Sequence, residues 1–149
     1  MLIRRFPLSQ FRCQIVTPSE SVLDEQVEYV SFPAWDGEIG VMNGTSPFLM
    51  NLGTGAMRID FGSGSRHYLL DGGFAQMQDD TLTLLADDVV PADHIELKDA
   101  ERELQEANEA ATISGQTTAM ERKHVEGAQR RANAKVALAN LTASRPGSV

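Results

Sequence analysis

The stretch "TLTLLADDVVPADHIELKDAERELQEANEAA" (Thr81–Ala111) contains two different hydrophobic periods, separated at Pro91. Before the proline, apolar and polar residues alternate, as in a strand with one buried face. After it, apolar residues recur every three or four positions, which places them on one side of a helix. These residues are Leu97, Ala100, Leu104, Ala107 and Ala111. The stretch therefore predicts that a strand domain ends near Pro91 and that a helical segment follows it.

The residues upstream repeat the alternating pattern in short runs. The runs are Phe11–Val16, Gln26–Phe32 and Ala56–Phe61, with glycine, proline and aspartate between them. In the first run Phe11, Cys13 and Ile15 share one face. Many short strands at close spacing, without a helical pattern between them, are typical of an antiparallel β-sandwich or barrel.

The downstream segment predicts an antiparallel hairpin of two helices. We expect Asp93 to cap the first helix, with Glu96 three residues later as in a capping box. The segment "SGQTT" (Ser114–Thr118) interrupts this helix, and a second helix is expected from about Ala119 to Thr142. Its apolar side is expected to consist of Val125, Ala128, Ala132, Val136 and Ala139. Both apolar sides are rich in alanine, so the helices can approach closely.

These patterns divide the chain into four expected parts. They are an N-terminal extension (1–10), a β-sandwich domain (11–90), a helical hairpin domain (91–143) and a disordered tail (144–149). The fold class is thus an N-terminal antiparallel β-sandwich followed by a C-terminal two-helix hairpin.

The charge distribution argues against several function classes. The chain has a net charge of −8, so it lacks the clustered cations that nucleic-acid binding needs. Residues 1–114 carry −12 and residues 115–149 carry +4, which predicts that the two segments face different partners or each other. Cys13 is the single cysteine, which excludes an internal disulfide. No apolar run approaches the roughly 20 residues that span a bilayer, so no direct membrane insertion is expected.

The sequence offers no catalytic or metal-binding constellation. It lacks the phosphate-binding glycine loop and the G-x-S-x-G nucleophile motif. The three histidines, His67, His94 and His124, lie far apart and do not share metal-ligand spacing. An enzyme with an unrecognised site is therefore the least favoured interpretation. A non-catalytic binding protein fits better.

The stretch "FPAWDGEIGVMNGTSPFL" (Phe32–Leu49) is expected to form two rigid turns. The first lies at Asp36–Gly37 and the second at Asn43–Gly44. We expect Trp35 to be exposed beside the first turn, and Phe48 and Leu49 to point inward after the second. An exposed aromatic and acidic groups on a rigid turn are typical of a docking surface.

Four pieces of sequence occur in an order that closely resembles the epsilon subunit of the F-type ATP synthase, called delta in mitochondria. They are "IVTPSESV" (Ile15–Val22), "FPAWDGEIGVMNGTSPFLMNLGTGAMRI" (Phe32–Ile59), "DGGFAQM" (Asp71–Met77) and "LTLLADD" (Leu82–Asp88). The resemblance implies a non-catalytic subunit of the central stalk, peripheral on the cytoplasmic side of a bacterial inner membrane. It also implies that the chain couples proton- or sodium-driven rotation to ATP synthesis. The alternative is a stand-alone β-sandwich adaptor that oligomerises through its helices.

The resemblance also assigns partners to particular residues. Trp35, Asp36, Gly37 and Glu38 match the loop that contacts the ring of c subunits. Gly44, Thr45, Ser46, Pro47 and Phe48 match a second loop near the contact with the gamma subunit, although the family usually has histidine where Thr45 stands. The hairpin is implied to extend toward the alpha and beta subunits and to inhibit ATP hydrolysis. The basic residues of its second helix are Arg122, Lys123, Arg130, Arg131 and Lys135.

Some bacterial members of this family bind ATP with the folded hairpin. Ile95, Glu96 and Ala100 match one part of that motif, and Arg131 and Lys135 match the other. Asp99, however, stands where the family has an arginine, which reverses the charge facing a phosphate. We therefore expect no ATP affinity and no other cofactor.

Overall fold

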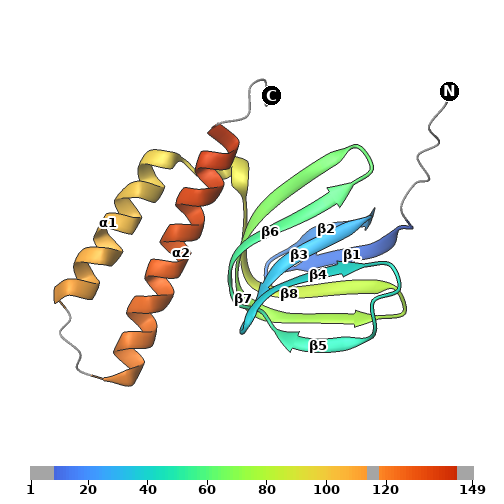
Figure 1. Ribbon diagram of the computed structural model, residues 1–149, viewed down its shortest axis with the longest axis horizontal. Helices are drawn as coiled ribbons and strands as arrows, with labels where there is room; N and C mark the ends of the chain where they lie inside the picture. The colour runs from blue at the N-terminus through green and yellow to red at the C-terminus, as the bar shows by residue number, and fades with distance from the viewer. Residues whose placement is uncertain (1–8, 114–117, 144–149) are drawn as a thin grey trace.

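The computed structural model describes residues 9–113 and 118–143, and in them eight strands precede two long helices (Figure 1). The strands are β1 (Phe11–Val16), β2 (Ser21–Val27), β3 (Tyr29–Ala34), β4 (Gly37–Met42), β5 (Phe48–Asn51), β6 (Thr54–Phe61), β7 (Gly64–Gln78) and β8 (Thr81–Pro91). A short 3₁₀ helix (Ala92–His94) leads into α1 (Leu97–Ile113), and α2 (Ala119–Ala143) follows. The predicted fold class, a β-sandwich followed by a helical hairpin, is confirmed.

The strands pair in the order β2-β1-β8-β7-β6-β3-β4, and β5 pairs with β7 outside this path. The pairing is antiparallel except between β1 and β8, which run parallel. This is a departure from the purely antiparallel expectation. It arises because β1 and β8 lie at opposite ends of the strand region, and only hairpin-linked neighbours are bound to be antiparallel.

Strand β7 takes part in both layers of the sandwich. Its first half pairs with β6 as far as Asp71, and its second half pairs with β5 from Phe74 onward. Between the halves, Gly72 and Gly73 have positive φ angles of 73° and 116°. A Cβ atom on Gly73 would overlap the carbonyl oxygen of Leu85, so only glycine fits this bend.

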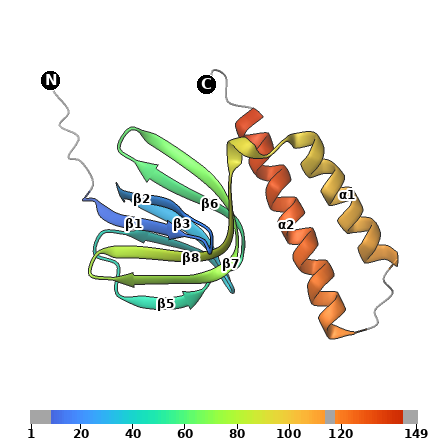
Figure 2. The ribbon, with the colours of Figure 1, turned by 180° about the vertical axis from the view of Figure 1, so that it is seen from behind.

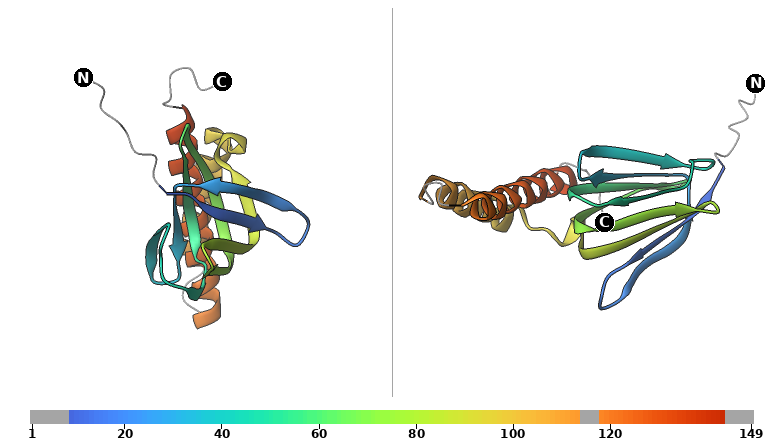
Figure 3. Two further views of the ribbon diagram at one scale, coloured as in Figure 1. Left: turned by 90° about the vertical axis from the view of Figure 1, so that its right-hand side faces the viewer. Right: turned by 90° about the horizontal axis from the view of Figure 1, so that it is seen from below.

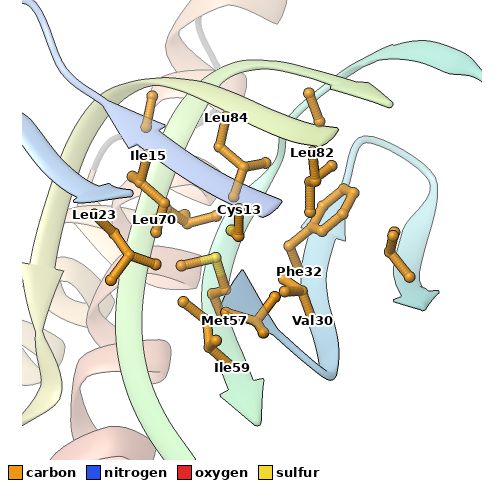
Figure 4. Packing of buried hydrophobic residues seen from close by; sticks show 14 of the residues in the cluster. Cys13, Ile15, Leu23, Val30, Phe32, Met57, Ile59, Leu70, Leu82 and Leu84 are labelled. Carbon is orange, nitrogen blue, oxygen red and sulfur yellow. The ribbon is translucent and has the colours of Figure 1, made fainter. Parts of the chain in front are cut away.

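The core lies between the two layers. Cys13 and Ile15 of β1, Met57 of β6 and Leu84 of β8 are fully buried there, and Figure 4 shows their side chains converging between the strands. The face predicted for Phe11–Val16 is confirmed, and the run Ala56–Phe61 lies within a strand as predicted. Burial raises the pKa of the Cys13 thiol to about 12, because the thiolate would lose its hydration.

The run Gln26–Phe32 was predicted as one strand, and this is wrong. The chain bends at Glu28, so β2 ends at Val27 and β3 begins at Tyr29. The bend shifts the alternation by one residue. As a result Val27 faces the core on one side of it, and Val30 and Phe32 face the core on the other.

The helices pack side by side at one end of the strand domain (Figures 2 and 3). α2 contacts β6 and β7, and α1 is held mainly through α2. Leu138 of α2 packs on Leu69 of β7 and on Ala92, and all three are buried. Because Leu70 faces the core while Leu69 faces α2, this part of β7 is buried on both sides.

The start of α1 differs from the prediction. Asp93 lies in the 3₁₀ helix and does not cap α1, because Ile95 is extended and separates the two helices. On α1 the predicted apolar side is confirmed, since its five members are the less exposed residues. On α2 the predicted apolar side is also confirmed, except at Ala128, which is exposed. Thr118, in the predicted interruption, accepts a hydrogen bond from the backbone N–H of Glu121 at 3.1 Å and so caps α2.

Candidate docking and regulatory surfaces

The first predicted turn projects from the end of the β3–β4 hairpin. Ala34 pairs with Gly37, so the two turn residues are Trp35 and Asp36, one position earlier than predicted. The Trp35 side chain is 73% exposed, as expected. The backbone N–H of Trp35 donates to the carbonyl of Asn51 at 3.3 Å, which ties the turn to the end of β5.

The second predicted loop is closed by Thr45, the residue that replaces the usual histidine. The Thr45 hydroxyl donates to the carbonyl of Met42 at 2.7 Å and accepts from the N–H of Met42 at 3.1 Å. The Asn43 amide donates to the carbonyl of Gln10 at 2.8 Å, which attaches the loop to the start of β1. Thr45 thus has a structural role in which a single hydroxyl serves both bonds.

Leu49 corrects one expectation for this loop. Phe48 packs against the core as predicted, whereas Leu49 is 72% exposed. Both residues lie in β5, where successive side chains point to opposite faces. One of the two must therefore face outward.

The structure does not bring the two predicted docking loops together. Trp35–Glu38 and Gly44–Phe48 lie at opposite ends of β4 (Figure 1). An extended strand rises about 3.3 Å per residue, so the six residues of β4 separate the loops by roughly 20 Å. The two loops can therefore serve different partners at the same time.

Arg131 of α2 reaches two carboxylates on the sandwich. Its Nη1 lies 3.2 Å from Asp71 and its Nη2 lies 3.3 Å from Asp88. Asp71 and Asp88 are directly paired residues of β7 and β8, so one guanidinium spans two neighbouring strands. Asp71 also accepts a hydrogen bond from the Thr54 hydroxyl at 2.8 Å. We call Arg131, Asp71 and Asp88 the latch.

Lys135, one turn further along α2, makes a different connection. Its Nζ lies 2.9 Å from Glu103 of α1, and its side chain is largely buried. The expected pairing of acidic and basic helices is thus met at Lys135, while Arg131 pairs with the sandwich instead. Arg122, Lys123 and Arg130 are exposed on α2.

The residues matched to a nucleotide motif are only partly gathered. Ile95, Glu96, Ala100 and Lys135 line one cavity of about 570 Å³. Arg131 lines a different cavity, of about 650 Å³, between the helices and the sandwich. The first cavity also contains Asp99, Glu103 and Glu106, so its wall is rich in carboxylates.

An apolar strip that the sequence reasoning missed lies on the outer face of the sandwich. It consists of Leu49, Phe74 and Leu85, which are each more than half exposed on the adjacent strands β5, β7 and β8. Phe74 pairs directly with Leu85. The uncharged side chains Gln76 and Thr83 pair with each other two residues away, on the same face. The sequence contained one indication of this strip. Leu84 and Leu85 are consecutive residues of a strand, so one of the two side chains must point away from the core.

Residues 10–92 match the family model described as "ATP synthase, Delta/Epsilon chain, beta-sandwich domain". The match covers more than half of the chain. The chain belongs to the ATP synthase delta/epsilon chain family.

Curated relatives agree with this family. The chain is 40% identical over 96 residues to the ATP synthase epsilon chain of Rhodopirellula baltica, covering 64% of this chain and 75% of that protein. It is 32% identical over 102 residues to the sodium-ion-specific ATP synthase epsilon chain of Propionigenium modestum, covering 68% and 74%. The fold resembles a chain of the Euglena gracilis mitochondrial ATP synthase, with a TM-score of 0.75 and 22% identity over 94% of this chain and 87% of that chain.

Family membership confirms the prediction of a non-catalytic ATP synthase subunit and favours it over the stand-alone adaptor. Among residues 9–113 and 118–143, no helix of this delta/epsilon chain is long and apolar enough to cross a membrane.

Proposed function

We propose that this chain is a rotor subunit of the central stalk, which connects the gamma subunit to the ring of c subunits. In this role it couples proton- or sodium-driven rotation to ATP synthesis, as a peripheral subunit on the cytoplasmic side of a bacterial inner membrane. The observation that carries the proposal is the family match over the sandwich. Two separated exposed surfaces on that sandwich give it one face for each partner.

The Trp35–Glu38 turn is the proposed contact with the c ring. The turn itself is held in place by the backbone hydrogen bond from Trp35 to Asn51. A rigid turn loses little conformational entropy on binding, and exposed tryptophans commonly supply much of the energy of an interface. Asp36 and Glu38 add two carboxylates that can pair with cations on the ring loops.

The strip of Leu49, Phe74 and Leu85 is the proposed contact with gamma. Exposed apolar residues gathered on three neighbouring strands are typical of a protein interface. The strip continues the loop Gly44–Phe48, because Leu49 follows directly after Phe48. Gln76 and Thr83 continue the strip with uncharged side chains on one side, which suits an apolar partner surface, and the strip is therefore assigned to the permanent contact with the shaft.

The test uses the enzyme complex reconstituted from its own organism with variants of this chain. Trp35→Ala combined with Glu38→Ala is expected to weaken retention on the c ring and to reduce coupling of ion transport to synthesis. Leu49→Ser combined with Phe74→Ser is expected to weaken co-purification with gamma. All four side chains are exposed or lie on a turn, so the sandwich is expected to stay folded. Circular dichroism checks this.

Two outcomes would contradict the assignments. If the Trp35/Glu38 variant couples transport to synthesis as well as wild type does, the turn is not the c-ring contact. If neither variant changes retention in the complex, the chain does not work as a rotor link. Glu126→Ala is the matched control, since it changes an exposed residue of α2 that belongs to neither surface.

The helical hairpin is the proposed brake on ATP hydrolysis. In the docked form, Arg131 and Lys135 are engaged by carboxylates of the same chain. Detachment of the hairpin from the sandwich would release Arg131, and separation of the two helices would also release Lys135. With Arg122, Lys123 and Arg130, α2 would then present five cations. Such a basic helix can be held electrostatically by acidic groups on the alpha and beta subunits.

A further inference from the structure

A cavity of about 410 Å³ lies between the Trp35–Glu38 turn and the helical hairpin. Trp35, Gly37 and Glu38 line one side of it, and Arg130 of α2 lines the other. The turn belongs to the sandwich, whereas α2 belongs to the helical hairpin that follows β8 and the short 3₁₀ segment. The cavity therefore exists in this form only while α2 lies against the sandwich.

The latch holds α2 at this position. Arg130 and Arg131 are consecutive residues, so the guanidinium that binds Asp71 and Asp88 fixes the backbone that carries Arg130. The other side of the cavity is held by backbone hydrogen bonds. Gly53 donates to the carbonyl of Pro33 at 2.9 Å, and Gly72 donates to the carbonyl of Gly53 at 3.2 Å.

An ion pair, two hydrogen bonds and short stretches of backbone connect the latch to the turn. Arg131 pairs with Asp71, Asp71 accepts from Thr54, and the neighbouring Gly53 donates to the residue two positions before Trp35. Undocking of α2 would remove Arg130 from the cavity and free Asp71 from its cation. Both changes would alter the charges on the surface next to the Trp35–Glu38 turn.

We propose that the Trp35–Glu38 turn and Arg130 form one composite docking surface, so that the partner at the turn binds the docked form of the hairpin more tightly. The proposal rests on the proposed function, which makes the polar loops of the c ring that partner. The surface presents an exposed indole together with a carboxylate and a guanidinium. It therefore fits a loop that offers an apolar contact flanked by charges of both signs. By linkage, a partner that prefers the docked form also stabilises it, and so restrains the brake.

The experiment measures binding and hairpin position together on the full chain. The probe is the isolated gamma–c-ring rotor of the same organism. Spin labels on Ser63→Cys and Met120→Cys report the distance between the sandwich and the start of α2, and Cys13 is too buried to take a label. The variants are Arg131→Gln, which breaks the latch, and Arg130→Gln, which leaves the latch intact. Arg122→Gln is the control on the same helix.

The proposal predicts a distinct result for each variant. Arg131→Gln starts with a lower docked fraction, binds the rotor about fivefold more weakly, and regains the docked distance when the rotor is added. Arg130→Gln also binds more weakly, but the rotor no longer changes its docked fraction. Arg122→Gln behaves as wild type does.

The composite surface would be overturned if Arg131→Gln bound the rotor with wild-type affinity and its label distance did not change on binding. The turn would then be a contact by itself. The proposed function fails in a different way. In that case Trp35→Ala with Glu38→Ala does not weaken rotor binding at all. The two failures are therefore distinguished by variants at different residues.

Discussion

Arg131 lies 3.2 Å from Asp71 and thereby joins the middle of α2 to the residue that precedes the double-glycine bend of β7. Both side chains are about one-third exposed, so the pair is partly screened by water. Salt weakens such pairs further. The docked position of the hairpin is consequently expected to depend on ionic strength.

Arg131→Gln and Asp71→Asn test this dependence in a double-mutant cycle. Each single change is expected to raise the undocked fraction, and the coupling between them to be below about 1 kcal/mol at low salt. The measurement is the distance between the labels on Ser63→Cys and Met120→Cys across a salt series. Lys135→Gln is the control, because Lys135 joins the two helices to each other. Additive effects of the two changes would mean that the ion pair does not hold the hairpin.

No saturable binding of ATP is expected in the millimolar range. Asp99, Glu103 and Glu106 line the cavity where the matched motif would hold a phosphate, and Arg131 is engaged elsewhere. Calorimetric titration of the isolated chain measures the affinity. Asp99→Arg restores the cation of the family motif and is expected to raise it. Clear binding by the wild-type chain would show that Lys135 and Arg131 suffice despite the carboxylates.

Truncation after Ala92 is expected to raise ATP hydrolysis and leave assembly intact. The cut removes both helices, and Arg130 with them, but it keeps β1–β8 with the Trp35–Glu38 turn and the apolar strip, which are expected to suffice for assembly. Full-length chain is expected to inhibit most at low salt, since a basic helix on an acidic surface loses affinity as salt rises. Hydrolysis by the reconstituted head is measured with each form across a salt series. Equal rates at low salt would remove the regulatory role.

The Cys13 thiol is expected to resist thiol reagents at pH 8 in the folded chain and to react after unfolding. Its pKa is about 12 in the fold and ordinarily about 9, so the unfolded thiol ionises first as pH rises. The unfolded state then binds fewer protons, and the free energy of unfolding falls by about 1.4 kcal/mol per pH unit between those values. Denaturant unfolding from pH 8 to pH 11 measures the slope. Cys13→Ala removes this contribution, so an equal slope in that variant would contradict the prediction.

The sequence predicted those features that depend on local pattern. The alternation in Phe11–Val16 and the change of period at Pro91 each follow from which residues must be buried within one element. The bend at Glu28 was missed because Gln26–Phe32 alternates without interruption on either side of it. Only the requirement to bury both Val27 and Val30 produces the bend, and that requirement comes from tertiary packing.

Of the candidate surfaces, too, only the parts that depend on local sequence could be predicted. Trp35 could be placed on an exposed turn because turn chemistry is local. The latch could not be predicted, because Asp71 and Asp88 become neighbours only through the pairing of β7 with β8. The sequence singled out Arg131 as a basic residue of the second helix, but the structure places its partners on the sandwich and not on α1. A count of charges gives the net charge of a segment. It does not show whether a basic helix pairs with the acidic helix α1 or with the acidic residues of the sandwich.

The bend at Gly72–Gly73 makes one covalent strand part of both layers of the sandwich. Side-chain packing alone would let the two layers slide over each other under a sideways force. Here such a force on the layer of β6 passes along the backbone of β7 to the layer of β5. In a part that turns with a shaft, torque applied to one face therefore reaches the other through peptide bonds.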